Sequence, residues 1–242
     1  DISITEAINC SVIEQGSVTV PANTLYDIVR KIPDGSEIEF ISNDGKKFSI
    51  RSGQSKFSLS CLAKTDFPLI EIDKLNCEFS INSNIFLKLI ERTRFAISNE
   101  ETRYFLNGIY FHKKSINNID CLSLVATDGH RLAKIDFPLQ NGLIDIPGVI
   151  IPKKTIYELC KLLTDVNEGI VINIDPNKII FYIGKTTLIS KLIDGNFPDY
   201  QRVIPKNNNM IVTANRQKFC EAVDRVSTIT SEKSRAIKFR LL

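Results

Sequence analysis

The sequence predicts an α+β protein that consists of repeated domains of about 130 residues each. Three observations lead to this prediction. Similar segments recur at separations of 130 to 133 positions, alternating apolar and polar runs flank turn sequences, and amphipathic helices begin at capping residues. The 242 residues are 43% hydrophobic and 24% charged, which is ordinary for a globular protein and excludes general disorder.

The clearest pair of similar segments is 20–28 (VPANTLYDI) and 151–159 (IPKKTIYEL), which are 131 positions apart. Each segment begins with a β-branched residue and proline and continues with Thr, an apolar residue, Tyr, an acidic residue and an apolar residue. This pattern predicts the end of a strand followed by a short helix. One face of the second helix is apolar at helical spacing and consists of Ile156, Leu159, Cys160 and Leu163.

Two further pairs of segments have nearly the same separation. Residues 57–60 (FSLS) and 188–191 (LISK) are alternating strand patterns, and each leads to a Phe-Pro pair. Residues 82–97 and 215–230 are amphipathic helix patterns with an Asn or Ser near the cap position. Independent matches at one long separation predict a tandem array of domains and not a solenoid of small repeats.

The repeat divides the chain into three parts. We expect residues 1–74 to be the C-terminal part of a first domain, 75–205 a complete second domain, and 206–242 the N-terminal part of a third. Because the chain begins and ends within the pattern, we expect the first and third domains to continue in residues that this sequence does not contain.

Turn sequences identify the antiparallel strands. Asp128-Gly129 lies between the alternating runs 122–127 and 130–135, and Asp-Gly in that position is the strongest short-range signal for a hairpin. A second hairpin is predicted for 171–174 and 179–183, around an Asp-Pro-Asn turn. Many antiparallel strands with two helices in each unit favour the α+β class.

Two local motifs have chemical interpretations. Gly184-Lys185-Thr186 resembles the end of a phosphate-binding loop, but that loop needs a glycine at position 179, where the chain has Ile. Asp128 beside His130 suggests acid–base chemistry, although an Asp at a turn also caps its own backbone. The residues alone leave three interpretations of this pair open: catalysis, a structural turn with a polar tip, and binding.

Basic residues recur on the predicted helices. The net charge is +3, and residues 206–242 contain eight basic and three acidic residues. The helix pattern 83–97 places Lys88 and Arg92 on one face. The opposite face is apolar and consists of Ile85, Phe86, Leu89 and Ile90. A single basic face is usually only solvated, but basic faces on repeated helices can line one surface and attract phosphates without reading sequence. No aromatic residues are interleaved on these faces, so stacking of single-stranded bases is not expected.

The sequence predicts no metal site, no cofactor and no membrane span. Six cysteines are scattered without a C-x-x-C pair, and together with two histidines they provide no zinc-binding spacing. We therefore expect reduced thiols that pack as small hydrophobic residues in a cytoplasmic protein. No run of about 18 apolar residues occurs.

Four motifs together resemble a known family. They are residues 51–59 (RSGQSKFSL), 103–108 (RYFLNG), 126–133 (ATDGHRLA) and 194–205 (DGNFPDYQRVIP). The combination closely resembles the β sliding clamps of bacterial DNA polymerase III, and the resemblance covers essentially the whole chain. It implies the DNA clamp fold, in which repeated domains have two helices on the inner face and antiparallel sheets outside. It also implies a full-length chain of three domains and a homodimeric ring of six domains. The net charge departs from this family, whose members are usually acidic.

The resemblance also implies a function without catalysis. A ring of this family encircles double-stranded DNA non-specifically and tethers DNA polymerase III subunits, the clamp loader and other proteins that carry a clamp-binding motif. Two alternatives remain open. One is a clamp-like scaffold that binds peptides without encircling DNA, and the other is an enzyme acting on nucleic acid through Asp128 and His130.

The family's functional positions can be carried over by motif. The pocket for partner peptides matches Leu106, Thr127, Gly129, His130, Arg131, Leu132, Pro198, Arg202 and Val203. Its apolar members are expected to take apolar peptide side chains, and its two arginines to meet polar or acidic groups. The expected duplex contacts follow helix position and are Lys88, Arg92, Arg103, Lys153, Lys154 and Arg216.

Overall fold

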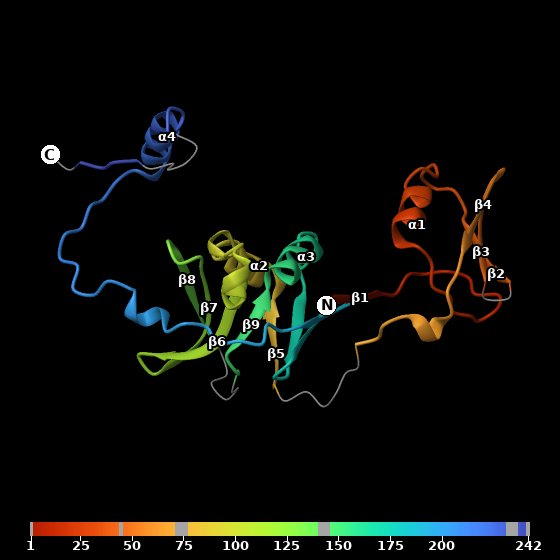
Figure 1. The fold of residues 1–242 in the computed structure, drawn as a ribbon, viewed down its shortest axis with the longest axis horizontal. Coiled ribbons are helices and arrows are strands. Elements are labelled where there is room, and N and C mark those ends of the chain that lie inside the picture. The colour runs from red at the N-terminus through yellow and green to blue at the C-terminus, as the bar shows by residue number, and fades with distance from the viewer. Residues whose placement is uncertain (1, 44–45, 71–76, 140–145, 231–236, 241–242) are drawn as a thin grey trace. The chain divides into compact units, whose positions relative to one another are not determined.

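A computed structural model describes residues 2–43, 46–70, 77–139, 146–230 and 237–240 of the chain (Figure 1). Contacts divide the chain into two units, Asp1–Phe197 and Pro198–Leu242, and each is described by itself. The expected boundary between residues 74 and 75 lies outside the described residues.

The larger sheet of the first unit has five antiparallel strands in the order β1-β12-β11-β10-β5. In chain order they are β1 (Ile2–Glu6), β5 (Cys77–Asn82), β10 (Gly169–Ile174), β11 (Lys178–Ile183) and β12 (Thr186–Lys191). The predicted Asp-Pro-Asn turn is confirmed, because Oδ1 of Asp175 accepts the N–H groups of Asn177 and Lys178 at 2.7 Å. Gly184, with φ of +56°, forms the next tight turn, so its motif belongs to a hairpin and not to a phosphate loop.

The second sheet has four antiparallel strands in the order β8-β7-β6-β9. They are β6 (Gly108–Ile116), β7 (Ile119–Thr127), β8 (Leu132–Pro138) and β9 (Val149–Pro152). The predicted hairpin at Asp128-Gly129 is confirmed, but its second strand begins at Leu132 and not at residue 130. The connection is longer because the side chains of Thr127 and Asp128 bond the backbone of residues 129–131.

Two helices pack against each other and against strands of both sheets (Figure 1). Helix α2 (Ser83–Glu91) starts at the predicted cap, since Oδ1 of Asn82 accepts the N–H groups of residues 84 and 85. Helix α3 (Lys153–Leu163) buries the face predicted for it. The prediction of a continuous helix to residue 97 was wrong. Helix α2 ends because Thr93 leaves the helical conformation and donates its hydroxyl to the last carbonyl groups, and a 3-10 turn, η2 (Arg94–Ala96), follows.

The core between the helices and the two sheets is aromatic and aliphatic. Phe86 of α2 is fully buried, and its ring lies 6.0 Å from that of Phe181 in β11 and 6.2 Å from that of Phe111 in β6. The predicted apolar face of α2 is confirmed for Phe86, Leu89 and Ile90. Ile85 was assigned to that face wrongly, because its side chain is 37% exposed.

Residues 22–66 repeat the element order of the middle of the chain. Helix α1 is followed by a three-stranded antiparallel sheet, just as α3 is followed by β10, β11 and β12. The elements are α1 (Ala22–Val29), β2 (Glu39–Asn43), β3 (Lys47–Ser52), β4 (Ser55–Ser60) and η1 (Lys64–Asp66). The 131-residue repeat of the sequence is therefore also a repeat of topology.

The second unit contains η4 (Tyr200–Arg202) and α4 (Arg216–Ser227). Helix α4 begins at the predicted cap, where Oδ1 of Asn215 accepts the N–H group of Lys218 at 3.1 Å. In the part of the chain that the structure describes, no helix is both long enough and apolar enough to cross a bilayer.

Replacing Phe86 tests the core. We expect Phe86→Ala to lower the free energy of unfolding by about 3–5 kcal/mol, because it removes a ring that contacts both sheets. Ile85→Ala on the same helix is the matched control and should cost less than about 1 kcal/mol, since Ile85 is partly exposed. Chemical denaturation followed by far-UV circular dichroism measures both, and equal losses would contradict the core described here.

Candidate functional site

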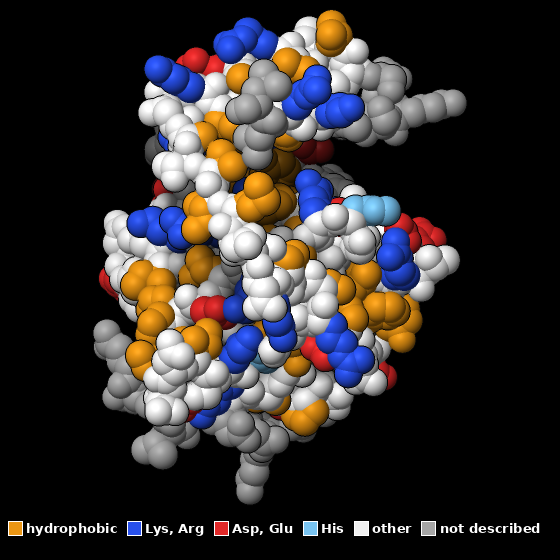
Figure 2. Space-filling model, turned by 90° about the vertical axis from the view of Figure 1, so that its left-hand side faces the viewer, with side chains coloured by type: hydrophobic (Ala, Val, Ile, Leu, Met, Phe, Trp, Pro, Cys, Tyr) orange, Lys and Arg blue, Asp and Glu red, His pale blue; other side chains and the backbone are white. Residues whose placement is uncertain are grey.

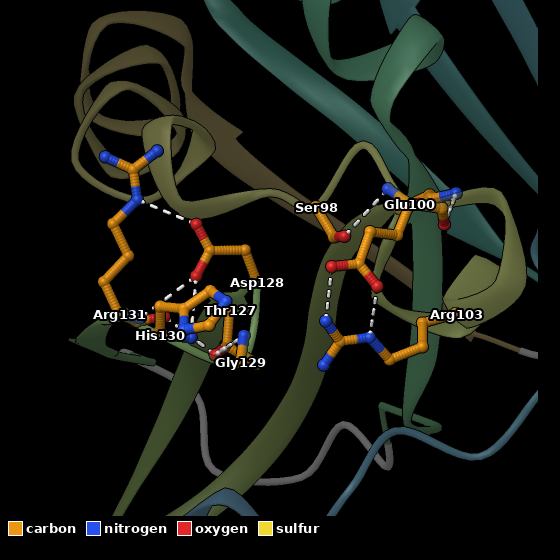
Figure 3. Close-up of polar contacts among 9 residues, drawn as sticks. Ser98, Glu100, Arg103, Thr127, Asp128, Gly129, His130 and Arg131 are labelled. Carbon is orange, nitrogen blue, oxygen red and sulfur yellow. Dashed lines mark hydrogen bonds and ion pairs between the residues drawn. The ribbon is translucent and has the colours of Figure 1, made fainter. Parts of the chain in front are cut away.

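The connection between β7 and β8 is held in one conformation by its own side chains (Figure 3). Oδ1 of Asp128 accepts the N–H groups of His130 and Arg131, each at 3.0 Å. The hydroxyl of Thr127 donates to the carbonyl of Arg131 at 2.7 Å and accepts the N–H group of Gly129 at 3.1 Å. The sequence interpretation of Asp128 as a residue that caps its own backbone is confirmed.

Asp128 also orients Arg131. Its Oδ2 accepts a hydrogen bond from Nε of Arg131 at 3.0 Å, and the Arg131 guanidinium lies 5.6 Å from the centre of the Phe95 ring. Partial burial raises the pKa of Asp128, but the hydrogen bonds from Arg131 and His130 outweigh it and lower the pKa overall. The carboxylate therefore stabilises the turn while it is ionised, above the ordinary Asp pKa of about 3.9, and this stabilisation is lost as the pH falls below it. Such a carboxylate is a poor proton acceptor at neutral pH, which disfavours the acid–base interpretation.

Arg103 lies close to the same turn. It lies in the 3-10 segment η3 (Glu101–Leu106), and it binds both carboxylate oxygens of Glu100, at 2.7 and 2.5 Å. The hydrogen bond to Arg103 lowers the pKa of Glu100. Gly129, with φ of +88°, lies over this guanidinium, so that a Cβ there would be 2.6 Å from Nη1 of Arg103. The sequence prediction named Arg103 as a duplex contact and did not foresee its pairing with Glu100.

The nine predicted pocket residues fall in both units. In the first unit, Thr127 to Leu132 form the turn just described, whereas Leu106 is 4% exposed and offers little surface to a ligand. Pro198, Arg202 and Val203 belong to the second unit. There Nε of Arg202 pairs with Asp199 at 2.9 Å and Val203 is 69% exposed. A pocket that unites all nine stays a prediction.

The residues predicted to contact duplex DNA have different surroundings. Lys88 of α2, Arg92 directly after α2, Lys154 of α3 and Arg216 of α4 are exposed, and among the described residues none of them forms an ion pair. Lys153 donates a hydrogen bond to Oδ1 of Asn99. On the face drawn in Figure 2, basic side chains lie among apolar, uncharged and acidic ones.

The described residues contain no group of three or more His, Cys, Asp or Glu side chains that could hold a metal ion. A hollow of about 320 Å³ lies beside the ends of β9, β11 and β12, between Gly148, Asn177 and Gly195 among others. None of the predicted site residues lines it.

Two family models match the chain, in the order expected from the repeat. That of the DNA polymerase III beta subunit, N-terminal domain, matches residues 1–71, and that of the central domain of the same subunit matches residues 80–199.

Curated relatives and solved structures agree with these matches. The chain is 46% identical to the beta sliding clamp of Caulobacter vibrioides over 92% of its own length, and 36% identical to that of Escherichia coli over 93%. It spans about 60% of the length of each. A sliding clamp of Bartonella birtlesii bound to griselimycin superimposes with a TM-score of 0.92 at 47% identity, covering 97% of this chain and 63% of that one. The Caulobacter crescentus clamp gives 0.93 at 44% identity, with 97% and 62% covered.

Gly129 and Gly184 both have positive φ, but only Gly129 lies close to Arg103. Comparing alanine variants of the two distinguishes the effect of backbone strain from the effect of contact with Arg103. Gly129→Ala and Gly184→Ala should each destabilise the chain by about 1–2 kcal/mol, the cost of a left-handed alanine. We expect Gly129→Ala alone to disturb Arg103, because Gly184 has no atom within 4 Å of an added Cβ. The Nε–H resonance of Arg103 in NMR spectra reports this change. An unchanged resonance in Gly129→Ala would contradict the contact between the turn and Arg103.

Proposed function

The chain belongs to the DNA polymerase III β-subunit family, and on that premise we propose that it forms part of a sliding clamp, a closed ring that encloses duplex DNA and tethers the replicative polymerase to it. The observation that carries this proposal is the match of two successive clamp domains along the chain, at residues 1–71 and 80–199. The proposed role is topological and needs no catalytic residue. The proposed setting is the cytoplasm, where the chromosome of a bacterium is replicated.

We divide the chain as the repeat suggests, into domain parts 1–74, 75–205 and 206–242. Pairing between the first two parts supports this array, because β1 extends the sheet that ends in β12 across the proposed boundary. Strands β1 and β8 occupy equivalent places in successive repeats, because β1 lies before α1 and β8 lies before α3 in the chain. Strand β8 is the last strand of its sheet among the described residues, so its outer edge is the equivalent place for a strand of the third domain. The same strand pairing between each domain and the next would extend the array. Between two full-length chains it would close a homodimeric ring.

The proposed contacts with DNA are electrostatic and independent of sequence. Exposed Lys88, Arg92 and Lys154, together with Lys153 and Arg216, would meet phosphates on the inner surface of the ring. Weak contacts suit this role, since tight contacts would impede sliding. Arg103 fits it less well than the others, because Glu100 already balances its charge.

The proposed pocket for partner peptides contains Leu106, Thr127, Gly129, His130, Arg131, Leu132, Pro198, Arg202 and Val203. Two observations support a binding role for the turn within it: its backbone is fixed by Asp128 and Thr127, and the exposed Arg131 is held over Phe95. A preorganised surface loses less entropy on binding. The expected partners are polymerase subunits, the clamp loader and other proteins with a clamp-binding motif. Clamps of Bartonella birtlesii and Pseudomonas aeruginosa bind griselimycin, and we propose that this chain shares that ligand.

Retention on circular DNA tests the ring. The sample is a full-length chain in which the Caulobacter vibrioides clamp supplies the part of its length that residues 1–242 do not span. A clamp loader places it on nicked circular plasmid, and gel filtration in high salt follows. We expect the protein to remain on circular DNA and to be lost after the plasmid is cut, because a ring slides off the ends.

The unmodified Caulobacter clamp shows in parallel that the loader is active. A protein held by charge alone would leave both forms of DNA in high salt. Equal loss from circles and linear DNA would therefore overturn the ring and favour the alternative, a clamp-like scaffold that binds peptides without encircling DNA.

The pocket is tested separately with griselimycin and the same full-length chain. We expect Val203→Asp to weaken binding by about tenfold or more, because it places a charge on a surface proposed to be apolar. Val212→Asp is the matched control, since Val212 is 63% exposed and Val203 is 69% exposed. Titration calorimetry gives both affinities. Equal affinities would remove Val203 from the pocket and leave the ring untouched.

A further inference from the structure

Two cations lie against one exposed tyrosine at the junction of η2 and α3. The guanidinium carbon of Arg94 is 5.4 Å from the centre of the Tyr157 ring, and Nζ of Lys153 is 5.7 Å from it. Oδ1 of Asn99 accepts a hydrogen bond from Lys153 and so holds this side chain from a second direction. Arg94, Tyr157 and Lys153 are called the Tyr157 cluster below.

The Tyr157 cluster restrains its positive charges without neutralising them. Tyr157 is 40% exposed, and neither Arg94 nor Lys153 pairs with a carboxylate of the described residues. A cation–π contact at an exposed site is weak, so it orders a side chain but leaves its charge available to a ligand. Cations that are already ordered lose less conformational entropy when they bind.

Arg94 and Arg103 differ in the group that holds the guanidinium. Both arginines follow α2, but Nε and Nη2 of Arg103 donate to the carboxylate of Glu100, whereas Arg94 rests on an uncharged ring. The charge of Arg103 is therefore balanced by Glu100, whereas no carboxylate of the described residues pairs with Arg94. Lys154, the exposed chain neighbour of Lys153, extends the positive surface along the first turn of α3.

The chemistry of the Tyr157 cluster fits phosphate oxygens. Guanidinium and ammonium groups donate short, charge-assisted hydrogen bonds to phosphate. A ring already covered by cations is a poor platform for stacking an unpaired base, so recognition of single strands is disfavoured. Contacts to phosphate alone carry no sequence information, as sliding requires.

We infer that the Tyr157 cluster is a preorganised contact for the phosphate backbone of duplex DNA, with Arg94 and Lys153 as the binding cations and Tyr157 as the positioning residue. The inference rests on the proposed function and deepens it. It adds Arg94 and Tyr157 to the proposed DNA-binding surface, and it expects Arg94 to contribute more to phosphate binding than Arg103.

Binding of the 242-residue chain to a fluorescent duplex of mixed sequence tests the inference by anisotropy at several salt concentrations. We expect Arg94→Ala to weaken binding several-fold and to reduce the slope of log K against log salt by about 0.9, the value for one lost phosphate contact. Tyr157→Ala should also weaken binding although it removes no charge. Tyr157→Phe should bind as the unmodified chain does, because the ring remains.

Two controls remove the same charge elsewhere. Arg51→Ala on β3 breaks a pair with Glu39, and Lys113→Ala on β6 breaks a pair with Asp120; both should leave the salt slope unchanged. Circular dichroism verifies that each variant is folded, and Lys153→Ala provides a second charge variant if Tyr157→Ala unfolds. A normal slope in both Arg94→Ala and Lys153→Ala, with weaker binding in Lys154→Ala, would overturn the cluster and leave the proposed clamp intact. No binding of the unmodified chain at any salt concentration would overturn the cluster together with the proposed DNA contacts.

Discussion

Phe86 stands where α2 and both sheets of the first unit meet, and the geometry of the candidate surface depends on this contact. Its ring touches Phe181 of the five-stranded sheet and Phe111 of the four-stranded sheet, and Phe111 in turn stacks with Phe79 at 6.0 Å. Large aromatic side chains contribute strongly to core energetics when they are buried. Since α2 also packs against α3, this single cluster sets the positions of both helices and hence of the basic residues on their outer faces.

Charged residues of the first unit have two distinct tasks. Asp128 and Glu100 bind arginines and thereby shape the turn, while Lys88, Arg92 and Lys154 keep their charges free. Exposed ion pairs contribute little to stability, typically about 0–1 kcal/mol, so the value of these pairs lies in orientation. A basic residue counted from the sequence is therefore a candidate for phosphate contact only when the structure leaves its charge unbalanced.

Local patterns were sufficient to predict much of the fold. The caps at Asn82 and Asn215 and the turn at Asp175 follow from side chains that bond their own neighbouring backbone, so a few residues of sequence determine them. The end of α2 was missed because it depends on the conformation of Thr93, which helical periodicity does not encode. The contact between Arg94 and Tyr157 joins residues 63 positions apart and arises where α2, which η2 follows, packs against α3, so no spacing rule could predict it.

The repeat also separates what a sequence pattern determines from what its surroundings determine. Helix α1 and helix α3 have the same apolar face, yet the described α1 buries no residue, whereas α3 buries five. At equivalent positions Val29 is 38% exposed and Cys160 is 8% exposed. The difference follows from α2 and the strands that cover α3, because an amphipathic face is buried only where another element meets it. The pattern thus specifies which face of each helix is to be covered, and the packing of neighbouring elements decides where basic side chains on the opposite face can form one continuous surface.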